Sequence, residues 1–298
     1  ICLLHGHPAL DRSWACRERL DRIPAILKRF RQFVLAAATD GQLTQFMREN
    51  NRNSVWKNTT LSECGTVSGG LTKNAKRQLL RMTKPYLRVA NVYANNLDLS
   101  DVAEIGLTET EYTKIKLQSG DLLIVEGNGS LDQLGRVAIW QDELNDCVHQ
   151  NHLIRWRTNG PLPKFVLIWL LSPKGRKDLM NQASTTTGLH TLSISKVGAI
   201  PIKLPSLSEQ TEIVRRVEEL FAYADRIEAR YQAARARVDK LTPAILAKAF
   251  RGELVPQDPN DEPASILLER IRASRAEDAV SPKPKRSLGK KIRATDEN

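Results

Sequence analysis

The middle of this 298-residue chain is rich in side chains that hydrogen-bond to nucleotide bases and phosphates. Arginine pairs with guanine, asparagine and glutamine pair with adenine, and lysine, serine and threonine bind phosphate oxygens. Taken singly, each such residue is more often a solvated or turn residue, but these cluster in glycine- and threonine-rich segments typical of loops. We therefore predict a nucleic-acid-binding site made of Lys73, Lys76, Arg77, Arg88, Asn91, Tyr93, Asn95, Asn128, Ser130, Arg136, Gln150, Asn151, His152, Thr186, Thr187, His190, Ser193, Ser195 and Lys196.

Two acidic residues, Asp121 and Glu126, stand on either side of an apolar run and invite comparison with a metal-dependent nuclease. Such a site also needs a lysine or a further carboxylate directly afterwards, and Gly127 and Asn128 follow instead. The chain has no glycine-rich phosphate-binding loop and no Asn-Pro-Pro-aromatic tetrapeptide with which amino-methyltransferases grip a flipped base. We predict Asp121 to be a turn residue that opens a strand, and we expect no catalytic residues.

By residue type alone, Cys147, His149 and His152 could form a metal-binding group. In a strand, however, positions 149 and 152 face opposite sides, which argues against their binding one ion. The cysteines are scattered without paired spacing, at positions 2, 16, 64 and 147. This usage is typical of a reducing compartment. We expect no metal site, no disulfide and a cytoplasmic location.

Between residues 45 and 205, turn signals separate short apolar segments, which predicts a mixed α/β (α+β) domain. Its size, about 160 residues, is enough to bury a core. The longest apolar run, Phe165–Leu171, is too short to span a membrane. We predict strands at Leu87–Val92, Leu122–Val125, Arg136–Trp140 and His152–Trp156, and helices at Leu162–Leu171 and Lys174–Gln182.

From Ser208 to Phe250, apolar or small residues recur at alternating steps of four and three, and most residues between them are charged. This is the heptad pattern of a coiled coil. At ~1.5 Å per residue the helix is on the order of 60 Å long. Its narrow apolar stripe needs a partner helix, and from periodicity alone a coiled coil between chains is the simpler interpretation.

A partner helix is also predicted within the same chain. Residues 34–44 align without gaps on residues 245–255, and the same offset of 211 places five further positions of the stripe on apolar residues between Cys16 and Phe30. We infer an internal duplication. The two helices are predicted to pack through Leu20, Ile23, Leu27, Phe30, Val34, Ile213, Val217, Leu220, Ile227, Tyr231, Val238, Leu241 and Ile245.

The first helix is predicted at Ala15–Ala38, with a kink or restart at Pro24, because proline removes a hydrogen bond inside a helix. Each copy of the repeat carries a glycine just past its last apolar turn, Gly41 in the first and Gly252 in the second. Helices commonly end at a glycine that adopts a positive φ.

These patterns divide the chain into four parts: residues 1–44 with the first helix, 45–205 with the mixed domain, 206–255 with the second helix, and a C-terminal extension, 256–298. Gly6 and Pro8 interrupt the repeat, so we expect that the N-terminal region is truncated or altered. In the extension we predict a short amphipathic helix at Ala264–Arg275, followed from Ser281 by a basic disordered tail.

The composition, 41% hydrophobic and 27% charged residues, is that of a folded globular chain. Lysine and arginine outnumber aspartate and glutamate by 45 to 34, which gives a net charge of +11. Such an excess favours a polyanionic partner, although scattered surface lysines explain it equally well.

Seven segments together resemble the specificity subunit of type I restriction-modification systems, over roughly residues 15 to 275. They are Tyr86–Val92, Leu117–Gly127, Leu134–Ala138, His149–His152, Thr186–Ser195, Ile202–Gln210 and Ala247–Gln257. The resemblance implies two target-recognition domains, each followed by a long helix, with the helices packed antiparallel as a spacer. This sequence departs from that pattern: we expect one recognition domain between the two helices, and we expect the other to be missing before Ile1.

The resemblance also implies a function. We expect a non-catalytic subunit that reads one half of a bipartite double-stranded DNA target and docks the DNA methyltransferase (modification) subunits and, through the complex, the restriction/translocase subunits. S-adenosylmethionine would bind the modification subunit, ATP and Mg²⁺ the restriction subunit, and no cofactor this chain. Two alternatives stay open: a half subunit that homodimerises on a symmetric target, and a coiled-coil scaffold that binds proteins. A nuclease or methyltransferase acting alone is a more distant one.

Overall fold

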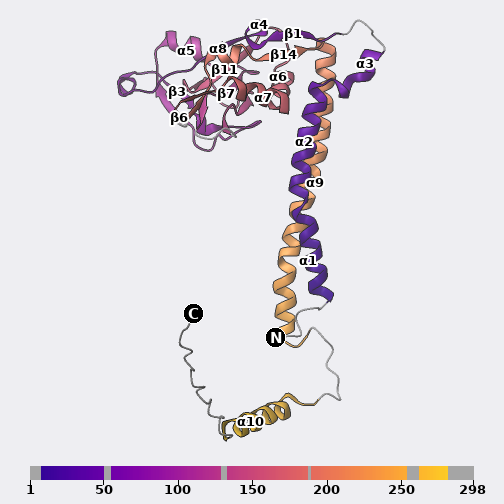
Figure 1. Cartoon of the computed structure of the whole chain (residues 1–298). Helices are drawn as coiled ribbons and strands as arrows, with labels where there is room; N and C mark the ends of the chain where they lie inside the picture. The colour runs from indigo at the N-terminus through magenta and orange to yellow at the C-terminus, as the bar shows by residue number, and fades with distance from the viewer. Residues whose placement is uncertain (1–7, 50–54, 129–132, 187–188, 254–261, 281–298) are drawn as a thin grey trace, which may run out of the picture. The chain divides into compact units, whose positions relative to one another are not determined.

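The computed structural model describes residues 8–49, 55–128, 133–186, 189–253 and 262–280. The chain forms two compact units, one of residues 15–236 and one of residues 1–14 together with 237–298. Over the residues described, the larger unit combines five small sheets with helices, which confirms the predicted mixed α/β fold (Figure 1). None of the helices described is long and apolar enough for a membrane span. The predicted basic tail from Ser281 lies outside the described residues.

The central sheet has four antiparallel strands in the order β2 (Gly65–Ser68), β11 (Leu153–Thr158), β7 (Leu122–Val125) and β9 (Val137–Ile139). Both faces of this sheet are buried. Alternate residues of β7 and β11 enter two different cores, which explains why β7 lacks the polar alternation of a half-exposed strand. One core contains Leu122, Ile124, Ile154 and Trp156, and the other contains Leu123, Val125 and Leu153.

Smaller sheets surround this one. Strand β3 (Thr83–Leu87) pairs with β10 (Val148–His149) in parallel and with β6 (Ala103–Gly106) antiparallel. The remaining pairs are antiparallel: β1 (Lys57–Thr60) with β14 (Pro201–Leu204), β4 (Val92–Tyr93) with β5 (Asn96–Leu97), and β13 (Leu189–Thr191) with both β12 (Ser184–Thr186) and β8 (Gly127–Asn128).

The strand predicted at Leu87–Val92 is misplaced, because the strand occupies Thr83–Leu87 and is followed by a 3₁₀ turn, η4 (Val89–Asn91). The Asn91 side chain causes the turn. Its oxygen accepts from the backbone N–H of Arg88 at 2.9 Å, which bends the chain back on itself.

Two consecutive helices, α6 (Pro163–Leu171) and α7 (Pro173–Gln182), lie where the sequence predicts them. Each begins with proline, which costs no hydrogen bond in the first turn. Ser172 caps α7 by accepting from the N–H of Gly175 at 3.1 Å. The apolar run Phe165–Leu170 is buried. The shorter helices are α3 (Gln45–Glu49), α4 (Leu61–Cys64), α5 (Glu109–Ile115), α8 (Ile194–Gly198) and the 3₁₀ helices η2 (Gln42–Thr44) and η3 (Ala75–Leu79).

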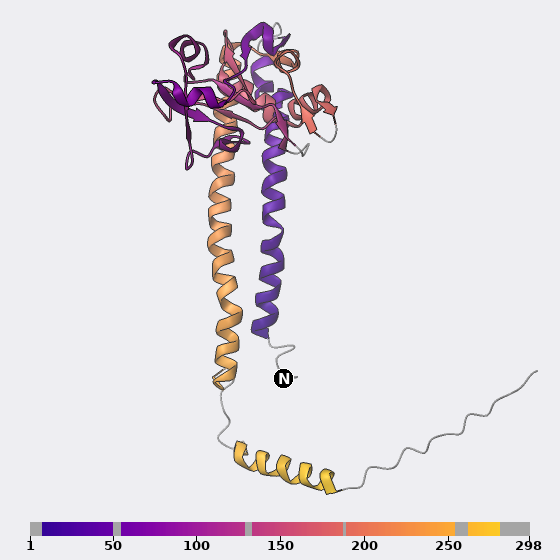
Figure 2. The ribbon, with the colours of Figure 1, turned by 90° about the vertical axis from the view of Figure 1, so that its left-hand side faces the viewer.

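The long helices are α1 (Pro8–Asp21), α2 (Ile23–Thr39) and α9 (Leu207–Phe250). The break between α1 and α2 falls at Arg22, next to Pro24, as predicted. Within the larger unit, α2 and α9 lie side by side (Figures 1 and 2). Arg235 contacts Asp21, and the side chains of Glu228 and Arg31 are 2.7 Å apart. Because the α9 numbers fall as the α1–α2 numbers rise, the helices are antiparallel.

The residues predicted to join the helices are mostly withdrawn from solvent. Leu27, Val34, Ile213, Val217 and Val238 are buried. Half-buried are Leu20, Ile23, Phe30, Leu220, Ile227, Tyr231 and Ile245.

The prediction for Leu241 is wrong, because this side chain is 46% exposed. The next residue of α9 after Val238 that is at least half-buried is Thr242, four positions further on, whereas the heptad pattern predicts Leu241, three positions further on. Thr242 is the residue that faces α1, since its hydroxyl lies 3.4 Å from that of Ser13. On the first helix, Cys16 is likewise exposed.

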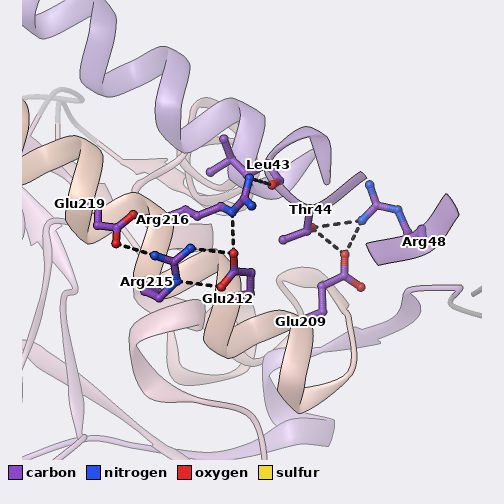
Figure 3. Close-up of polar contacts among 8 residues, drawn as sticks. All are labelled: Leu43, Thr44, Arg48, Glu209, Glu212, Arg215, Arg216 and Glu219. Atoms are coloured by element: carbon purple, nitrogen blue, oxygen red, sulfur yellow. Dashed lines mark hydrogen bonds and ion pairs between the residues drawn. The ribbon is translucent and has the colours of Figure 1, made fainter. Parts of the chain in front are cut away.

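A cluster of polar contacts joins the start of α9 to the segment after α2 (Figure 3). Glu209 is 1% exposed, accepts from the Thr44 hydroxyl at 2.7 Å and forms an ion pair with Arg48. Two turns further along, Arg216 donates to the Leu43 carbonyl at 2.8 Å and to Glu212 at 2.6 Å. These contacts fix the chain at the point where it leaves the helix pair for the mixed domain.

Glycine ends both copies of the repeat as predicted, with φ of 75° at Gly41 and 73° at Gly252. The C-terminal extension contains α10 (Ala264–Val280), five residues longer than predicted. The prediction that it is amphipathic is wrong, because three of its large apolar residues are consecutive and spread around the helix: Ile266, Leu267 and Leu268. With Ile271, they are exposed.

Among the described residues the cysteines are free thiols. Burial raises the pKa of Cys64 to about 11 and that of Cys147 to about 12. Both side chains are therefore neutral at physiological pH and behave as small core residues.

Replacing Arg48 by alanine is expected to destabilise the larger unit, because the buried Glu209 carboxylate loses its guanidinium partner. We expect the free energy of unfolding, measured by urea denaturation, to fall by roughly 1–3 kcal/mol. The control is Arg215→Ala, which breaks exposed ion pairs with Glu212 and Glu219 and should cost about 0–1 kcal/mol. Equal losses in the two variants would contradict a special role for the buried pair.

Candidate nucleic-acid interface

The turn between β10 and β11, Gln150–His152, is the most closely fixed of the predicted contact segments. Leu153 N–H donates to the Gln150 carbonyl at 2.9 Å and closes the turn. Two outside segments hold it: Gln150 N–H donates to Leu87 at 2.9 Å, and Asn151 N–H donates to Leu71 at 3.1 Å. The backbone of the turn is thus fixed while the His152 side chain stays exposed.

Behind this turn lies His149, whose ring is 0% exposed. Its Nδ1 is 3.0 Å from the Leu153 carbonyl, so Nδ1 carries the proton and donates. Burial, reinforced by the positive charge of Arg155, lowers the pKa of His149 to about 4, and the ring is neutral at physiological pH. Because His149 points inward and His152 outward, the two do not share a ligand. Over the described ranges, no three His, Cys, Asp or Glu residues are grouped to hold a metal ion.

Glu126 joins the turn to the neighbouring hairpin. Its N–H donates to the His152 carbonyl at 2.9 Å, and its carboxylate lies 3.0 Å from Nδ1 of His152. Its carbonyl accepts from Leu192 N–H at 2.7 Å. Directly after it, Asn128 is the register partner of His190 across β8 and β13. The hairpin β12–β13 therefore lies beside the turn.

A second group is linked to Gln150 through the backbone of Val89. The Gln150 side-chain oxygen accepts from Val89 N–H at 3.3 Å, and Arg136 donates to the Val89 carbonyl at 3.4 Å. The Arg136 guanidinium also lies 5.2 Å from the centre of the Tyr93 ring, a cation–π distance. Asn95, in the tight β4–β5 turn with φ of 57°, donates its N–H to Val137 at 2.8 Å.

These contacts bring together residues from four separate stretches of sequence. We call the group the loop edge: Tyr93, Asn95, Glu126, Asn128, Arg136, Gln150, Asn151, His152 and His190. It combines amides, two imidazoles, a guanidinium and a carboxylate on fixed backbone with a tyrosine that is 44% exposed. Such groups distinguish the donor and acceptor patterns of base pairs. From the sequence, Glu126 stands out only as half of a possible nuclease pair, since its position beside His152 depends on strand pairing.

The side chains of three predicted contact residues are already engaged in hydrogen bonds and ion pairs within the protein. Arg77 holds both carboxylate oxygens of Glu111, at 2.9 and 3.1 Å, which lowers the pKa of Glu111 to about 2. Asn91 is 3% exposed and donates its amide hydrogens to the carbonyls of residues 98 and 101. Arg88 pairs with Asp101 at 2.8 Å. Asn91 cannot reach a ligand, and the two arginines are bound by their carboxylate partners.

The other predicted residues are less constrained. Lys73 and Lys76 are exposed around η3. Ser193 accepts from Lys196 N–H at 3.3 Å as the cap of α8, and its hydroxyl is 3.0 Å from that of Ser195. For Asn128 and Thr186 the structure gives the backbone but not the side chain, and Ser130 and Thr187 lie outside the described residues.

Asp121 has a structural role, as the sequence indicates. It is 0% exposed, holds Arg157 through both oxygens at 2.6 and 2.7 Å, and accepts from Gln118 N–H at 2.9 Å. A carboxylate neutralised and buried in this way is not available for metal-dependent cleavage.

Comparisons with known proteins agree on one family. Residues 53–234 match the family described as type I restriction modification DNA specificity domain. The chain is 40% identical over 276 residues to the type I restriction enzyme EcoKI specificity subunit of Escherichia coli K12, and 38% identical over 271 residues to the StySPI specificity subunit of Salmonella potsdam. Each alignment covers 87% of this chain and 58% of the relative, so the chain spans somewhat over half their length.

The fold also matches a solved structure described as the structural basis of complex assembly and conformational transition of the type I R-M system. The TM-score is 0.52 at 17% identity, and the match covers 83% of this chain and 61% of the other. At this identity the match supports the fold alone.

The low pKa of His149 predicts a specific pH dependence of stability. In the unfolded chain this residue titrates near 6.5, so between about pH 6.5 and 4 the unfolded state binds a proton that the folded state does not. The unfolding free energy should therefore fall as pH drops through this range. Urea titrations at about pH 7, 5.5 and 4.5 measure it. Over this pH range the unfolding free energy of His149→Asn should fall less than that of the native protein. Parallel curves for the two proteins would contradict the low pKa of His149.

Proposed function

This chain belongs to the type I restriction-modification DNA specificity family, and we propose that its mixed α/β domain reads one half of a two-part DNA target while its helix pair docks modification subunits. The relatives are named specificity subunits of restriction enzymes. Their names agree with the expectation that the chain is a recognition subunit and not itself an enzyme.

The loop edge carries the proposal for DNA reading. Sequence-specific binding needs donors and acceptors held in a fixed pattern, because each correct bidentate contact contributes about 1–3 kcal/mol of discrimination. At the loop edge the backbone of Gln150 and Asn151 is fixed by bonds of 2.9 and 3.1 Å to two separate segments. His152 is exposed there and Asn151 is half-buried, and Arg136 is oriented by Tyr93. We propose that these side chains contact base edges in the major groove.

The exposed face of α2 supports the proposal for subunit docking. Ile26 and Phe33 are 59% and 66% exposed. Together with two arginines they are spaced by four, three and four residues, and therefore lie along one face of the helix, in the order Arg22, Ile26, Arg29 and Phe33. We call these four residues the outer ridge. An exposed apolar ridge with flanking arginines is suited to a protein partner with an acidic and apolar surface. In the assembled complex, S-adenosylmethionine would bind the modification subunit, and ATP and Mg²⁺ the restriction subunit.

A second candidate is a half subunit that pairs with another copy and reads a symmetric target. The exposed apolar residues in the C-terminal part of α9 favour it, because a second copy would cover Leu241 and Phe250, which are 46% and 85% exposed. Sedimentation velocity at low micromolar concentration separates the two candidates. A monomer supports the first, and a dimer that dissociates in Phe250→Asp supports the second.

Replacing Asn151 by alanine should relax specificity at one base pair of the target, with a loss of about 1–3 kcal/mol for the correct sequence only. The target is first selected from a random duplex library with the full chain, and affinities are then measured by fluorescence anisotropy. By contrast, Lys76→Ala should weaken binding to all sequences and reduce the salt slope by about one.

The matched control is Lys28→Ala, which removes an exposed lysine from α2 and should leave both quantities unchanged. Failure of the native chain to select any sequence would refute DNA reading and favour a scaffold that binds only proteins.

Replacing Phe33 by aspartate should prevent assembly with the purified modification subunit of the same system, because a charge would enter the apolar contact. DNA selection by the free chain should be unaffected. Leu79→Asp is the control, since Leu79 is 86% exposed but lies in the mixed domain, outside the ridge. Co-elution in gel filtration measures assembly, and normal assembly of Phe33→Asp would place the docking surface elsewhere.

A further inference from the structure

We propose that His149 is a positioning residue for target discrimination, which it controls by holding the Gln150–His152 turn without touching DNA. This inference rests on the proposed function, because it explains how that turn would keep its reading geometry. His149 is not among the residues that the sequence indicated as contacts, and its complete burial prevents direct contact.

The ring spans the turn from the inside. Nδ1 of His149 donates to the carbonyl of Leu153, the first residue of β11, across a distance of 3.0 Å. The bond therefore ties the last residue of β10 to the first residue of β11, with the three turn residues between them. Together with the bond of 2.9 Å from Leu153 N–H to the Gln150 carbonyl, it leaves the turn little freedom to open.

The backbone of His149 is held as firmly as its ring. Its carbonyl accepts from Leu71 N–H at 2.9 Å. Gly70 approaches so closely that a Cβ there would lie 2.1 Å from the His149 carbonyl oxygen and 2.5 Å from that of Gln150. A side chain at position 70 would push the turn outward. This gives a second way of moving the turn without changing a side chain that faces DNA.

The surroundings of the ring keep it neutral. Arg155 is 6% exposed and donates to the carbonyls of Lys114 and Lys116 at 3.3 and 3.1 Å, and its charge and that of Arg157 disfavour a second proton on His149. With a neutral ring and its proton on Nδ1, the bond to Leu153 is present throughout the physiological pH range. Asparagine can present an N–H from nearly the position of Nδ1, whereas leucine has a similar volume and no donor.

The experiment compares His149→Leu and His149→Asn with the native full chain, using its selected target duplex and a scrambled duplex of equal length. We expect His149→Leu to reduce the ratio of target to scrambled affinity by about tenfold or more, with the scrambled affinity and its salt slope unchanged. His149→Asn should restore most of the ratio. Melting followed by circular dichroism establishes that each variant is folded.

Two results would overturn the inference: a native ratio in His149→Leu, or an equal loss of affinity for both duplexes, which indicates a merely structural role. If His149→Leu fails to fold, Gly70→Ala is measured in its place. We expect Gly70→Ala to lower the ratio of target to scrambled affinity, and a native ratio in this variant overturns the inference as well. In each of these cases the native chain still selects a target, so the proposed function stands. A native chain that selects no sequence removes both.

Discussion

The apolar face shared by α2, α6 and α9 is the contact on which the larger unit depends. Val34, Leu35 and Ala38 of α2 belong to the same core as Phe165 of α6 and Ile213 of α9. One face of the central sheet also packs into this core. The helix pair and the mixed domain are therefore one packed body within this unit and not two domains on a flexible linker. A reading surface built on the domain then has a fixed orientation relative to α2. The buried Glu209 and its partners fix the point where the chain passes between them.

Elements specified by local chemistry were predictable, and those specified by distant partners were not. The break at Arg22 and the helix end at Gly41 follow from proline and glycine, and α6 and α7 follow from an apolar run and its Pro-containing starts. The exposure of Leu241 depends on a distant partner, because Thr242 takes its place against α1, with its hydroxyl 3.4 Å from that of Ser13. The resemblance to type I specificity subunits is confirmed, because it rests on several segments at once and not on one motif.

The candidate interface shows the same division. Residue type identifies Arg77 and Arg136 equally well as arginines in loops, yet Arg77 is locked onto Glu111 while Arg136 lies against an exposed ring. Which of the two arginines is available to a ligand depends on partners far away in the sequence: Glu111 is 34 positions from Arg77, and Tyr93 is 43 positions from Arg136. No binding role was predicted for Glu126 or His149 for a related reason, since the neighbours that give them a role, His152 and Leu153, meet them only once strands have paired. Types of side chain indicate which chemistry is available, and pairing decides which side chains are free to use it.

A reading surface of this kind gains specificity from rigidity more than from the number of its contacts. Ordering a loose loop on DNA costs about 0.5–1.5 kcal/mol for each immobilised side chain, and the cost applies to correct and incorrect sequences alike. A loose loop also adapts to a wrong base pair, which narrows the difference between the two affinities. At the loop edge the turn is already ordered by bonds to Leu71, Leu87 and Leu153. A wrong base pair then leaves donors and acceptors unpaired, because the turn cannot move to meet it. The neutral, buried His149 serves this purpose better than a charged or exposed residue, because solvent and phosphate do not compete for its single proton.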